Sequence, residues 1–255
     1  MTSLRVLGCS GGIGGAHHTT AFLLNQTILL DAGTGVADLS SRELLQIEHV
    51  FLTHAHLDHI AYLPLLLDAT LGARTRPVIV HACAATIQML KTHIFNWHIW
   101  PDFSVIPSAE QPLLRFAAIE VGQTHCVDAL AITALPAEHT IAALAFQVSN
   151  FTASLVFSGD TIGGSAFWQA VNQIENLKIL IIETAFAESN AKLAQLAKHL
   201  CPSTLAAELR SVLAGVEVLI THLKPSEDQQ TMAEILALQP AAAVRRLIQG
   251  ETISF

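Results

Sequence analysis

The chain has 255 residues, of which 51% are hydrophobic and 13% are charged, so it can bury a large core and is not a disordered segment. Its formal net charge is -8, and no run of basic residues exceeds the pair Arg245 and Arg246, which argues against a nucleic-acid partner. The longest apolar stretch, 60–73, is broken by Pro64 and Asp68, so no membrane span is expected. The scattered cysteines and the absence of a secretory layout at the start of the chain predict a cytoplasmic protein with reduced thiols.

Short β-rich runs alternate with turn residues in the first half of the chain. Strands are expected at 4–7, 21–24, 27–31, 49–53 and 77–81, with a glycine-rich turn, GCSGGIGG, after the first. Helices are expected at 58–71 and 84–94. The segment FNWHIWPDFSVIP, at 95–107, is irregular and aromatic, as active-site loops often are.

The second half repeats this style, with strands followed by amphipathic helices. Strands are expected at 113–121, 130–135, 142–148, 154–157, 179–182 and 216–221. Helices are expected at 165–174, 190–199, 203–213 and 226–238. Two β-rich halves flanked by helices predict two sheets packed face to face with helices outside. With no repeat or linker between the halves, we expect a single domain over residues 1–255.

A histidine-rich motif directly follows the strand predicted at 49–53. It reads His54-Ala-His56-Leu-Asp58-His59, a pattern that chance would produce in about one chain in a thousand of this composition. The chain turns at the end of a strand, so these four side chains can converge. Imidazole and carboxylate groups suit zinc or a similar transition ion, and the motif therefore predicts a metal site.

Four residues of one loop cannot complete two coordination spheres, so further ligands are needed. His139, Asp160 and His222 each lie just beyond a predicted strand, as the histidine motif does. A lone histidine at a strand end is more often structural than a ligand. The shared position of these three residues makes them candidates, and we expect them to meet the motif in one pocket.

The order of the motifs HAHLDH, EHT, SGDT and THLKP resembles the metallo-β-lactamase superfamily, and the resemblance covers nearly the whole chain. It implies an α/β fold, a four-layer αββα sandwich with a two-metal hydrolytic centre at one edge. It also implies that Asp160 bridges two divalent ions. The remaining ligands would be His54, His56 and His139 for one ion, and Asp58, His59 and His222 for the other. Zinc is the expected metal, although manganese or iron would accept the same ligands.

Several stretches resemble the class II 3′,5′-cyclic-nucleotide phosphodiesterases in particular. They are VLGCSGG, HAHLDHIAYLPLLL, LKTHIFNWHIWPDFSVIP, IIETAF, HLCPSTLAAEL and ITHLKP. The third is the most specific, because it carries no metal ligand. Cys201 stands where the family pattern has threonine or serine, and Ala16-His17-His18 is unusual after the glycine-rich turn. These departures make the identity of the substrate less certain than the type of reaction.

The resemblance implies hydrolysis of cyclic AMP or cyclic GMP to the 5′-monophosphate. Two divalent ions that share a water would lower its pKa toward neutrality, with Asp58 and Asp160 as catalytic carboxylates. His199 is the candidate proton donor to the departing oxygen, and a surface histidine at a helix end is the equal alternative. Asp31 and Glu183 follow apolar strands and are expected to accept hydrogen bonds from ligand imidazoles, and a plain turn carboxylate at a strand end is the alternative for Asp31.

Candidate substrate contacts are weaker predictions. Trp97, Trp100 and Phe103 offer faces on which a base could stack, with core packing as the competing interpretation. His98 and Lys224 are candidates for contact with base or phosphate, with solvent exposure or a structural role as the alternative. The remaining histidines are interpreted as solvated or structural, namely His17, His18, His49, His81, His93 and His125.

Three other functions stay open. An endoribonuclease of the RNase Z kind shares the chemistry, but Leu57 stands where that family has glycine, and no basic arm is visible. Hydrolysis of a lactone, thioester or sulfate ester is compatible with the same metals. A sensory metal-binding module is disfavoured by the complete candidate ligand set. The expected partner is a small phosphodiester substrate, and a homodimer would suit the apolar composition.

Overall fold

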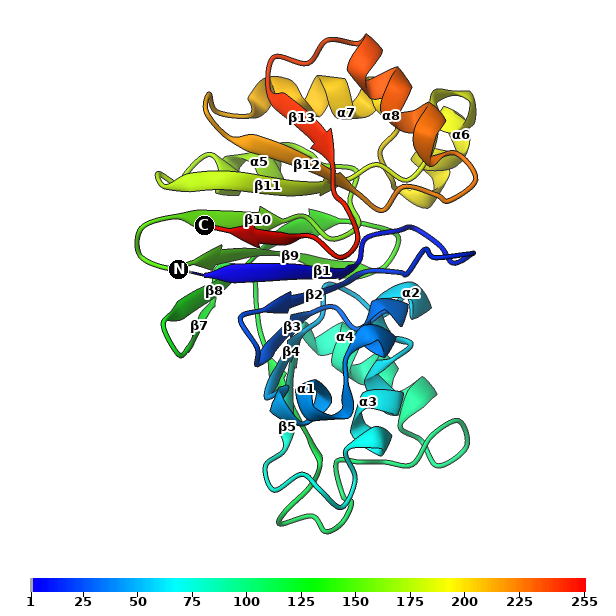
Figure 1. Cartoon of the computed structure of the whole chain (residues 1–255), viewed down its shortest axis with the longest axis vertical. Helices are drawn as coiled ribbons and strands as arrows, with labels where there is room; N and C mark the ends of the chain where they lie inside the picture. Colours follow the sequence, from blue (N-terminus) through cyan, green and yellow to red (C-terminus); the bar gives the residue numbers. More distant parts are fainter. Residues whose placement is uncertain (1) are drawn as a thin grey trace.

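The computed structural model describes residues 2–255 as two seven-stranded mixed sheets packed face to face, with helices on the outer faces (Figure 1). The first sheet has the order β14-β1-β2-β3-β4-β5-β6, and the second has the order β13-β12-β11-β10-β9-β8-β7. The αββα sandwich predicted from the sequence is therefore confirmed.

Each sheet combines antiparallel and parallel strands. The first contains β1 (Ser3–Gly8), β2 (Ala21–Leu24), β3 (Ile28–Leu30), β4 (His49–Phe51), β5 (Val78–Ala82), β6 (Leu114–Ala118) and β14 (Thr252–Ser254). The second contains β7 (Thr124–Val127), β8 (Leu130–Glu138), β9 (Ala142–Ser149), β10 (Ser154–Phe157), β11 (Leu177–Glu183), β12 (Glu217–Thr221) and β13 (Ala243–Arg246).

The helices are short. Those on the side of the first sheet are α1 (Ser41–Gln46), α2 (Leu57–Ile60), α3 (Leu63–Ala69) and α4 (Ala84–Met89), the last continued by a π-helical turn, Leu90–Ile94. Those on the side of the second sheet are α5 (Ser165–Val171), α6 (Ala191–Ala197), α7 (Pro202–Glu208) and α8 (Asp228–Ala237). Within residues 2–255, no helix is both long enough and apolar enough to cross a bilayer.

Strand direction places the candidate site at one edge of the sandwich. In the second sheet β8 and β10 are both antiparallel to β9, and β11 and β12 run parallel to β10. The carboxyl ends of these four strands therefore lie at the same edge. In the first sheet β3, β4 and β5 are parallel, so their carboxyl ends also share an edge. Polar residues that follow these strands can meet where the two edges adjoin.

Buried aromatic side chains join the two sheets behind this edge. The rings of Phe22 and Phe157 pack edge to face with centroids 4.9 Å apart, and those of Phe51 and Phe146 with centroids 5.6 Å apart. All four side chains are almost completely buried. Because burial of one phenylalanine contributes about 1.5–3 kcal/mol, this layer stabilises the packing of the two sheets behind the site.

Some predicted elements differ from the structure. The helix predicted at 58–71 is two helices, α2 and α3, because Tyr62 bonds back to the Ala32 carbonyl and Pro64 lies in the first turn of α3. The strand predicted at 113–121 ends at Ala118. The strands predicted from the sequence do not include β7, β13 and β14, which have only three or four residues each.

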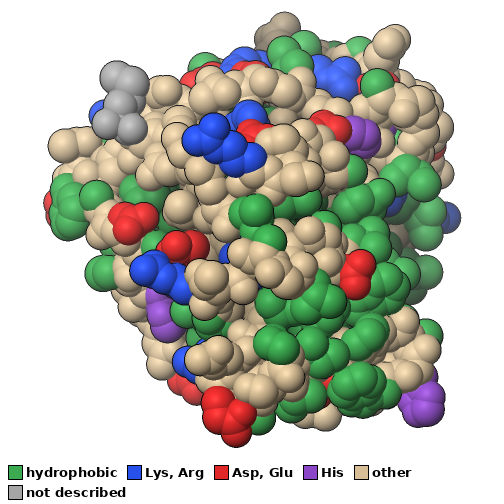
Figure 2. Space-filling model, turned by 60° about the horizontal axis from the view of Figure 1, so that its bottom comes forward, with side chains coloured by type: hydrophobic (Ala, Val, Ile, Leu, Met, Phe, Trp, Pro, Cys, Tyr) green, Lys and Arg blue, Asp and Glu red, His purple; other side chains and the backbone are tan. Residues whose placement is uncertain are grey.

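Exposed apolar side chains gather on one face, seen in Figure 2. Large hydrophobic residues that are exposed in α3 and in the segment 95–107 include Leu65, Trp97, Ile99 and Val105. Contiguous apolar surface of this kind often marks a contact between protein chains. The homodimer stays a prediction, and sedimentation of the purified protein would test it.

Three histidines that the sequence analysis took as structural form a cluster away from the candidate site. His49 Nδ1 lies 2.9 Å from His81 Nε2, and the rings of His81 and His125 have centroids 4.7 Å apart. The His81 ring also stacks on Phe51 at 4.2 Å. Burial, together with the neighbouring His125 and His49, lowers the pKa of His81 to about 3, so this imidazole is neutral in the folded protein.

Replacing His81 with phenylalanine is expected to reduce the loss of stability on acidification. The contribution of a neutral buried histidine is complete above its ordinary pKa of 6.5 and is lost as the pH falls toward 3. Between pH 7 and pH 5, the free energy of unfolding should decrease by about 1–2 kcal/mol less in the variant than in the wild type. Urea unfolding at both pH values measures this difference. The exposed His93, changed to phenylalanine, is the control, and an unchanged pH dependence in His81→Phe would contradict the prediction.

Candidate metal centre

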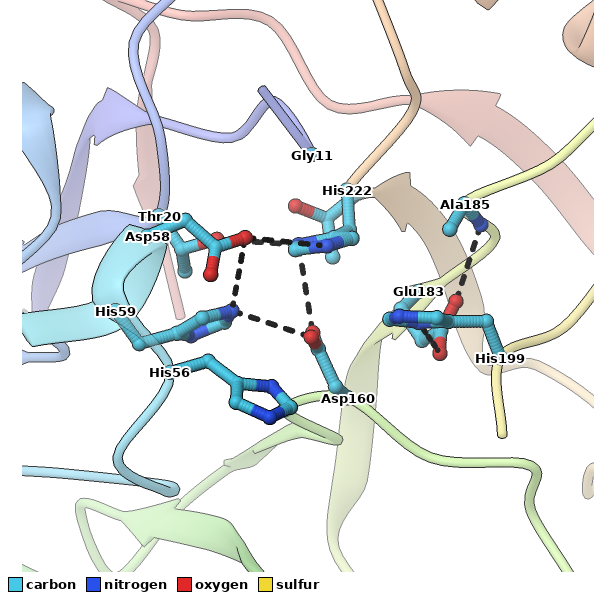
Figure 3. Close-up of polar contacts among 12 residues, drawn as sticks. Gly11, Thr20, His56, Asp58, His59, Asp160, Glu183, Ala185, His199 and His222 are labelled. Carbon is cyan, nitrogen blue, oxygen red and sulfur yellow. Dashed lines mark hydrogen bonds and ion pairs between the residues drawn. The ribbon is translucent and has the colours of Figure 1, made fainter. Parts of the chain in front are cut away.

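Seven side chains meet at the common edge of the two sheets, in two groups that share Asp160. Figure 3 shows the second group, with Asp160 between His59 and His222. Within each group the potential ligand atoms all lie within 4.8 Å of one another. The groups are His54, His56, His139 and Asp160, and Asp58, His59, Asp160 and His222. These are the seven residues that the sequence analysis selected. Their role as ligands stays a prediction.

Asp160 lies between the two groups. Its Oδ2 atom is 3.3 Å from His59 Nε2 and 3.6 Å from His54 Nε2. The same oxygen is 4.0 Å from His139 Nε2, and Oδ1 is 3.3 Å from His222 Nδ1. One carboxylate thus faces imidazoles of both groups, which is the position that a bridging ligand requires.

Hydrogen bonds behind the imidazoles set their orientation. His59 Nδ1 donates to Asp31 Oδ2 at 2.7 Å, and His139 Nδ1 donates to the Lys198 carbonyl at 3.0 Å. The Thr53 hydroxyl donates to Asp31 and lies 3.0 Å from His54 Nδ1, from which it can accept. In these three rings Nε2 is then the atom that faces the group, and the hydrogen bond behind the ring fixes its orientation, as is usual for metal-binding histidines. The sequence pattern predicts this role for Asp31 but not for Thr53, although Thr53 directly precedes the motif.

The protonation states suit cation binding. Burial lowers the pKa of His222 to about 3 and that of His139 to about 4, and it lowers the pKa of His54 well below its ordinary value. These imidazoles are neutral at pH 7. Burial alone would raise the pKa of Asp160, but the neighbouring His222 and His59 hold it well below its ordinary value, so the carboxylate is ionised.

His59 differs from the other imidazoles because two carboxylates flank it. Burial disfavours its charged form, yet Asp160 and Asp31 raise its pKa well above the ordinary value. Within residues 2–255, His59 Nε2 and Asp160 Oδ1 are buried without a hydrogen-bond partner. An unsatisfied buried polar group costs about 1–3 kcal/mol, and a cation between these atoms would remove that cost by displacing the His59 proton. The residues present therefore fit a pair of divalent ions.

His199 lies beside this cluster, with its ring centroid 4.9 Å from that of His139 and 5.4 Å from that of His222. Its Nδ1 donates to Glu183 Oε1 at 2.7 Å. Burial would lower the pKa of His199, but Glu183 raises it above the ordinary value. The expectation that Glu183 supports a ligand imidazole is wrong, because the end of β11 lies next to the segment after α6 and the partner is His199 instead.

Gly11 allows the chain to pass close to His222. A Cβ atom at Gly11 would lie 2.3 Å from the His222 carbonyl oxygen and 2.8 Å from the Cδ2 atom of its ring. Both distances are shorter than van der Waals contact, so any other residue would displace the histidine. The glycine-rich turn after β1 thus allows the backbone at Gly11 to lie against His222.

Replacing Gly11 with alanine is expected to weaken metal binding by about 10-fold or more, because His222 would move out of its group. Titration with zinc in competition with a chromophoric chelator measures the affinity. Ala16→Ser, at an exposed position of the same turn, is the control. Equal zinc affinities in Gly11→Ala and the wild type would rule out His222 as a ligand held by this contact.

The candidate substrate contacts in the segment 95–107 differ in how deeply they are buried. Phe103 is 1% exposed in the core beneath the first sheet, so its expected role as a stacking face is wrong, and core packing explains it. Trp100 is half-buried against the same core, and Trp97 is 63% exposed. The His98 amide donates to Asn96 within the same segment. Contact of Trp97, His98 and Trp100 with substrate stays a prediction.

Lys224 lies near the cluster, two residues after His222. Its Nζ atom donates to the Gly11 carbonyl and lies 5.7 Å from the centre of the Phe186 ring. Its predicted contact with phosphate also stays a prediction.

A family model described as "Beta-lactamase superfamily domain" matches residues 26–245. The chain belongs to the metallo-β-lactamase superfamily. The cluster occupies the edge at which the resemblance placed the metal centre.

Two curated relatives of different activity match this superfamily member. Endoribonuclease ysh-1 of Neurospora crassa is 29% identical over 173 residues, which are 62% of this chain and 20% of the relative. A probable 3′,5′-cyclic-nucleotide phosphodiesterase of Yersinia pestis is 26% identical over 207 residues, which are 72% of this chain and 59% of the relative. The chain thus spans less than two thirds of the length of either.

Solved structures share the fold over almost their whole length. Unliganded yeast PDE1 superposes with a TM-score of 0.80 at 18% identity, covering 98% of both chains. The metallo-β-lactamase fold protein YhfI of Bacillus subtilis superposes with a TM-score of 0.78 at 19% identity, covering 99% of this chain and 98% of that one. At these identities the likeness establishes the fold alone.

Proposed function

We propose that the protein is a metal-dependent phosphodiesterase that opens a 3′,5′-cyclic nucleotide to the 5′-monophosphate. The observation that carries the proposal is the pair of ligand groups joined by Asp160, with the Glu183–His199 pair beside them. The probable cyclic-nucleotide phosphodiesterase from Yersinia pestis, which matches 72% of this chain, supports the choice of substrate.

Two divalent ions bound in these groups would supply an activated water and neutralise the anionic oxygens of a phosphodiester. His54, His56 and His139 would hold one ion, and Asp58, His59 and His222 the other, with Asp160 shared. The preponderance of imidazole ligands favours zinc, and manganese or iron would accept the same set.

His199 would protonate the departing oxygen. The bond from Nδ1 to Glu183 fixes the ring and leaves Nε2 as the atom that can give a proton to the ester oxygen. Glu183 raises the pKa of His199 above its ordinary value against the effect of burial, which favours the protonated ring. The side chain is 10% exposed, so water has limited access to it.

An endoribonuclease is the second candidate, favoured by the match to ysh-1. Long RNA is bound chiefly through many contacts of lysine and arginine with phosphates. Here Lys198, beside the site, pairs with Glu138 at 3.1 Å, Lys224 donates to the Gly11 carbonyl, and the net charge is -8. The charge around the site thus favours a substrate with one phosphate over a polyanion.

A substrate panel tests the proposal. The protein, loaded with zinc or manganese, is incubated with cyclic AMP, cyclic GMP, linear dinucleotides and a tRNA precursor, and products are separated by chromatography. We expect the 5′-monophosphate from a cyclic nucleotide and little cleavage of the precursor. Cleavage of RNA without turnover of any cyclic nucleotide would favour the second candidate, and no phosphodiester cleavage at all would refute both.

A further inference from the structure

The loop that carries Asp160, residues 158–164, donates its last backbone hydrogen bond to a side chain outside the loop, the carboxylate of Glu208 in α7, which binds the loop at Gly164. Glu208, the last residue of α7, accepts a hydrogen bond from the Gly164 amide at 3.0 Å through its Oε2 atom. The same oxygen accepts the indole Nε1 hydrogen of Trp168 in α5. One carboxylate oxygen therefore joins α7, α5 and the loop 158–164.

The backbone of this loop is shaped to receive the carboxylate. Gly163 and Gly164 have φ angles of +81° and +97°, which only glycine adopts readily. A Cβ atom at Gly163 would lie 2.2 Å from Glu208 Oε2, so the carboxylate occupies the space that a side chain would need. Two adjacent glycines allow the backbone of the loop many conformations, and the hydrogen bond to Glu208 restricts it to one of them.

The part of the loop next to Asp160 is held by other groups. The Thr161 amide donates to Glu183 Oε1 at 3.1 Å, and the Gly163 amide donates to the Thr161 hydroxyl at 3.0 Å. The Ile162 amide donates to the Glu138 carbonyl at 3.0 Å. Each backbone amide from Thr161 to Gly164 thus donates a hydrogen bond, and the acceptor for the last of them, Gly164, is Glu208.

We propose that Glu208 is a positioning residue of the metal centre, which keeps the loop in the conformation that places the Asp160 carboxylate between the two ligand groups. The proposal rests on the metal binding of the proposed function, and not on the identity of the substrate. The helix α7 begins at Pro202, shortly after His199, and ends at Glu208 on the Asp160 loop. One short helix therefore links the candidate proton donor to the shared ligand.

Metal affinity tests the proposal without reference to turnover. In Glu208→Ala we expect the affinity for zinc, measured by chelator competition, to fall by about 10-fold, the lower end of the range for residues that orient ligands. Glu208→Gln should stay close to the wild type, because its amide oxygen can still accept both hydrogen bonds. Glu175→Ala, an exposed carboxylate after α5, is the matched control and should bind zinc like the wild type.

The visible spectrum of the cobalt-substituted protein separates positioning from a general loss of stability. We expect an altered spectrum in Glu208→Ala and an unaltered one in Glu208→Gln. Wild-type zinc affinity and spectrum in folded Glu208→Ala would overturn the proposal. If that variant does not fold, Glu208→Asp replaces it, with the same expected changes and the same overturning result. Absence of phosphodiester turnover in the wild type would refute the proposed function and leave this test intact.

Discussion

Replacement of Asp160 with alanine is expected to abolish phosphodiester hydrolysis and to reduce the bound metal from two ions to one or none. Asp160 faces imidazoles of both groups, because its Oδ2 atom lies 3.6 Å from His54 Nε2 in one group and 3.3 Å from His59 Nε2 in the other. Without it neither group is complete. Loss of the charge stabilisation that two ions provide, several kcal/mol, corresponds to a decrease in kcat/KM of at least about a thousandfold.

Metal content by plasma emission spectrometry and initial rates on the best substrate of the panel measure these two effects. Circular dichroism establishes that the variant is folded. Asp68→Ala, at an exposed position of α3, is the control and should retain both ions and full activity. Two bound ions with undiminished turnover in Asp160→Ala would show that the hydrolytic centre lies elsewhere.

Replacement of His199 with alanine is expected to lower kcat while both ions stay bound. A group that donates a proton in the transition state contributes about 10²–10⁴-fold, and the effect depends on the leaving group. A cyclic nucleotide leaves through an alkoxide that needs the proton, whereas p-nitrophenolate does not. The loss should therefore be large for cyclic nucleotides and small for a p-nitrophenyl phosphodiester. Glu183→Gln should show a weaker loss of the same kind, because Glu183 holds His199 Nδ1 at 2.7 Å.

The ratio of the two rates, rather than either rate alone, tests the assignment. Lys192→Ala, an exposed position of the neighbouring α6, is the control and should leave the ratio unchanged. An equal loss on both substrates in His199→Ala would assign His199 a structural or substrate-binding role. The metal content of each variant separates such a role from damage to the metal centre.

Much of the site could be predicted because strand ends are visible in the sequence. Buried strands are runs of apolar residues, and a polar residue just after such a run lies at the edge of a sheet. The motif 54–59 follows β4, His139 follows β8, and Asp160 and His222 follow β10 and β12. Two β-rich halves with amphipathic helices likewise indicated the sandwich before any contact between them was known.

Other features depend on contacts between residues far apart in the chain. The hydrogen-bond partner of Glu183 could not be predicted from the neighbouring sequence, because the tertiary packing of the segment after α6 brings His199 next to it. Strand β14 exists only because it pairs with β1, at the opposite end of the chain. Phe103 looked equally suited to a ligand and to the core, and only the packing beneath the first sheet decided between them.

The sequence by itself determined the chemistry of the candidate ligands and the order along the chain of the strands that precede them, because residue type and apolar periodicity are local properties. Apart from the bond to Asp31, only the tertiary structure decided how these side chains are supported. The approach of Gly11 to His222 and the bond from Glu208 to Gly164 join segments separated by many residues. Such pairs are selected by the free energy of packing the whole chain, which no local pattern contains.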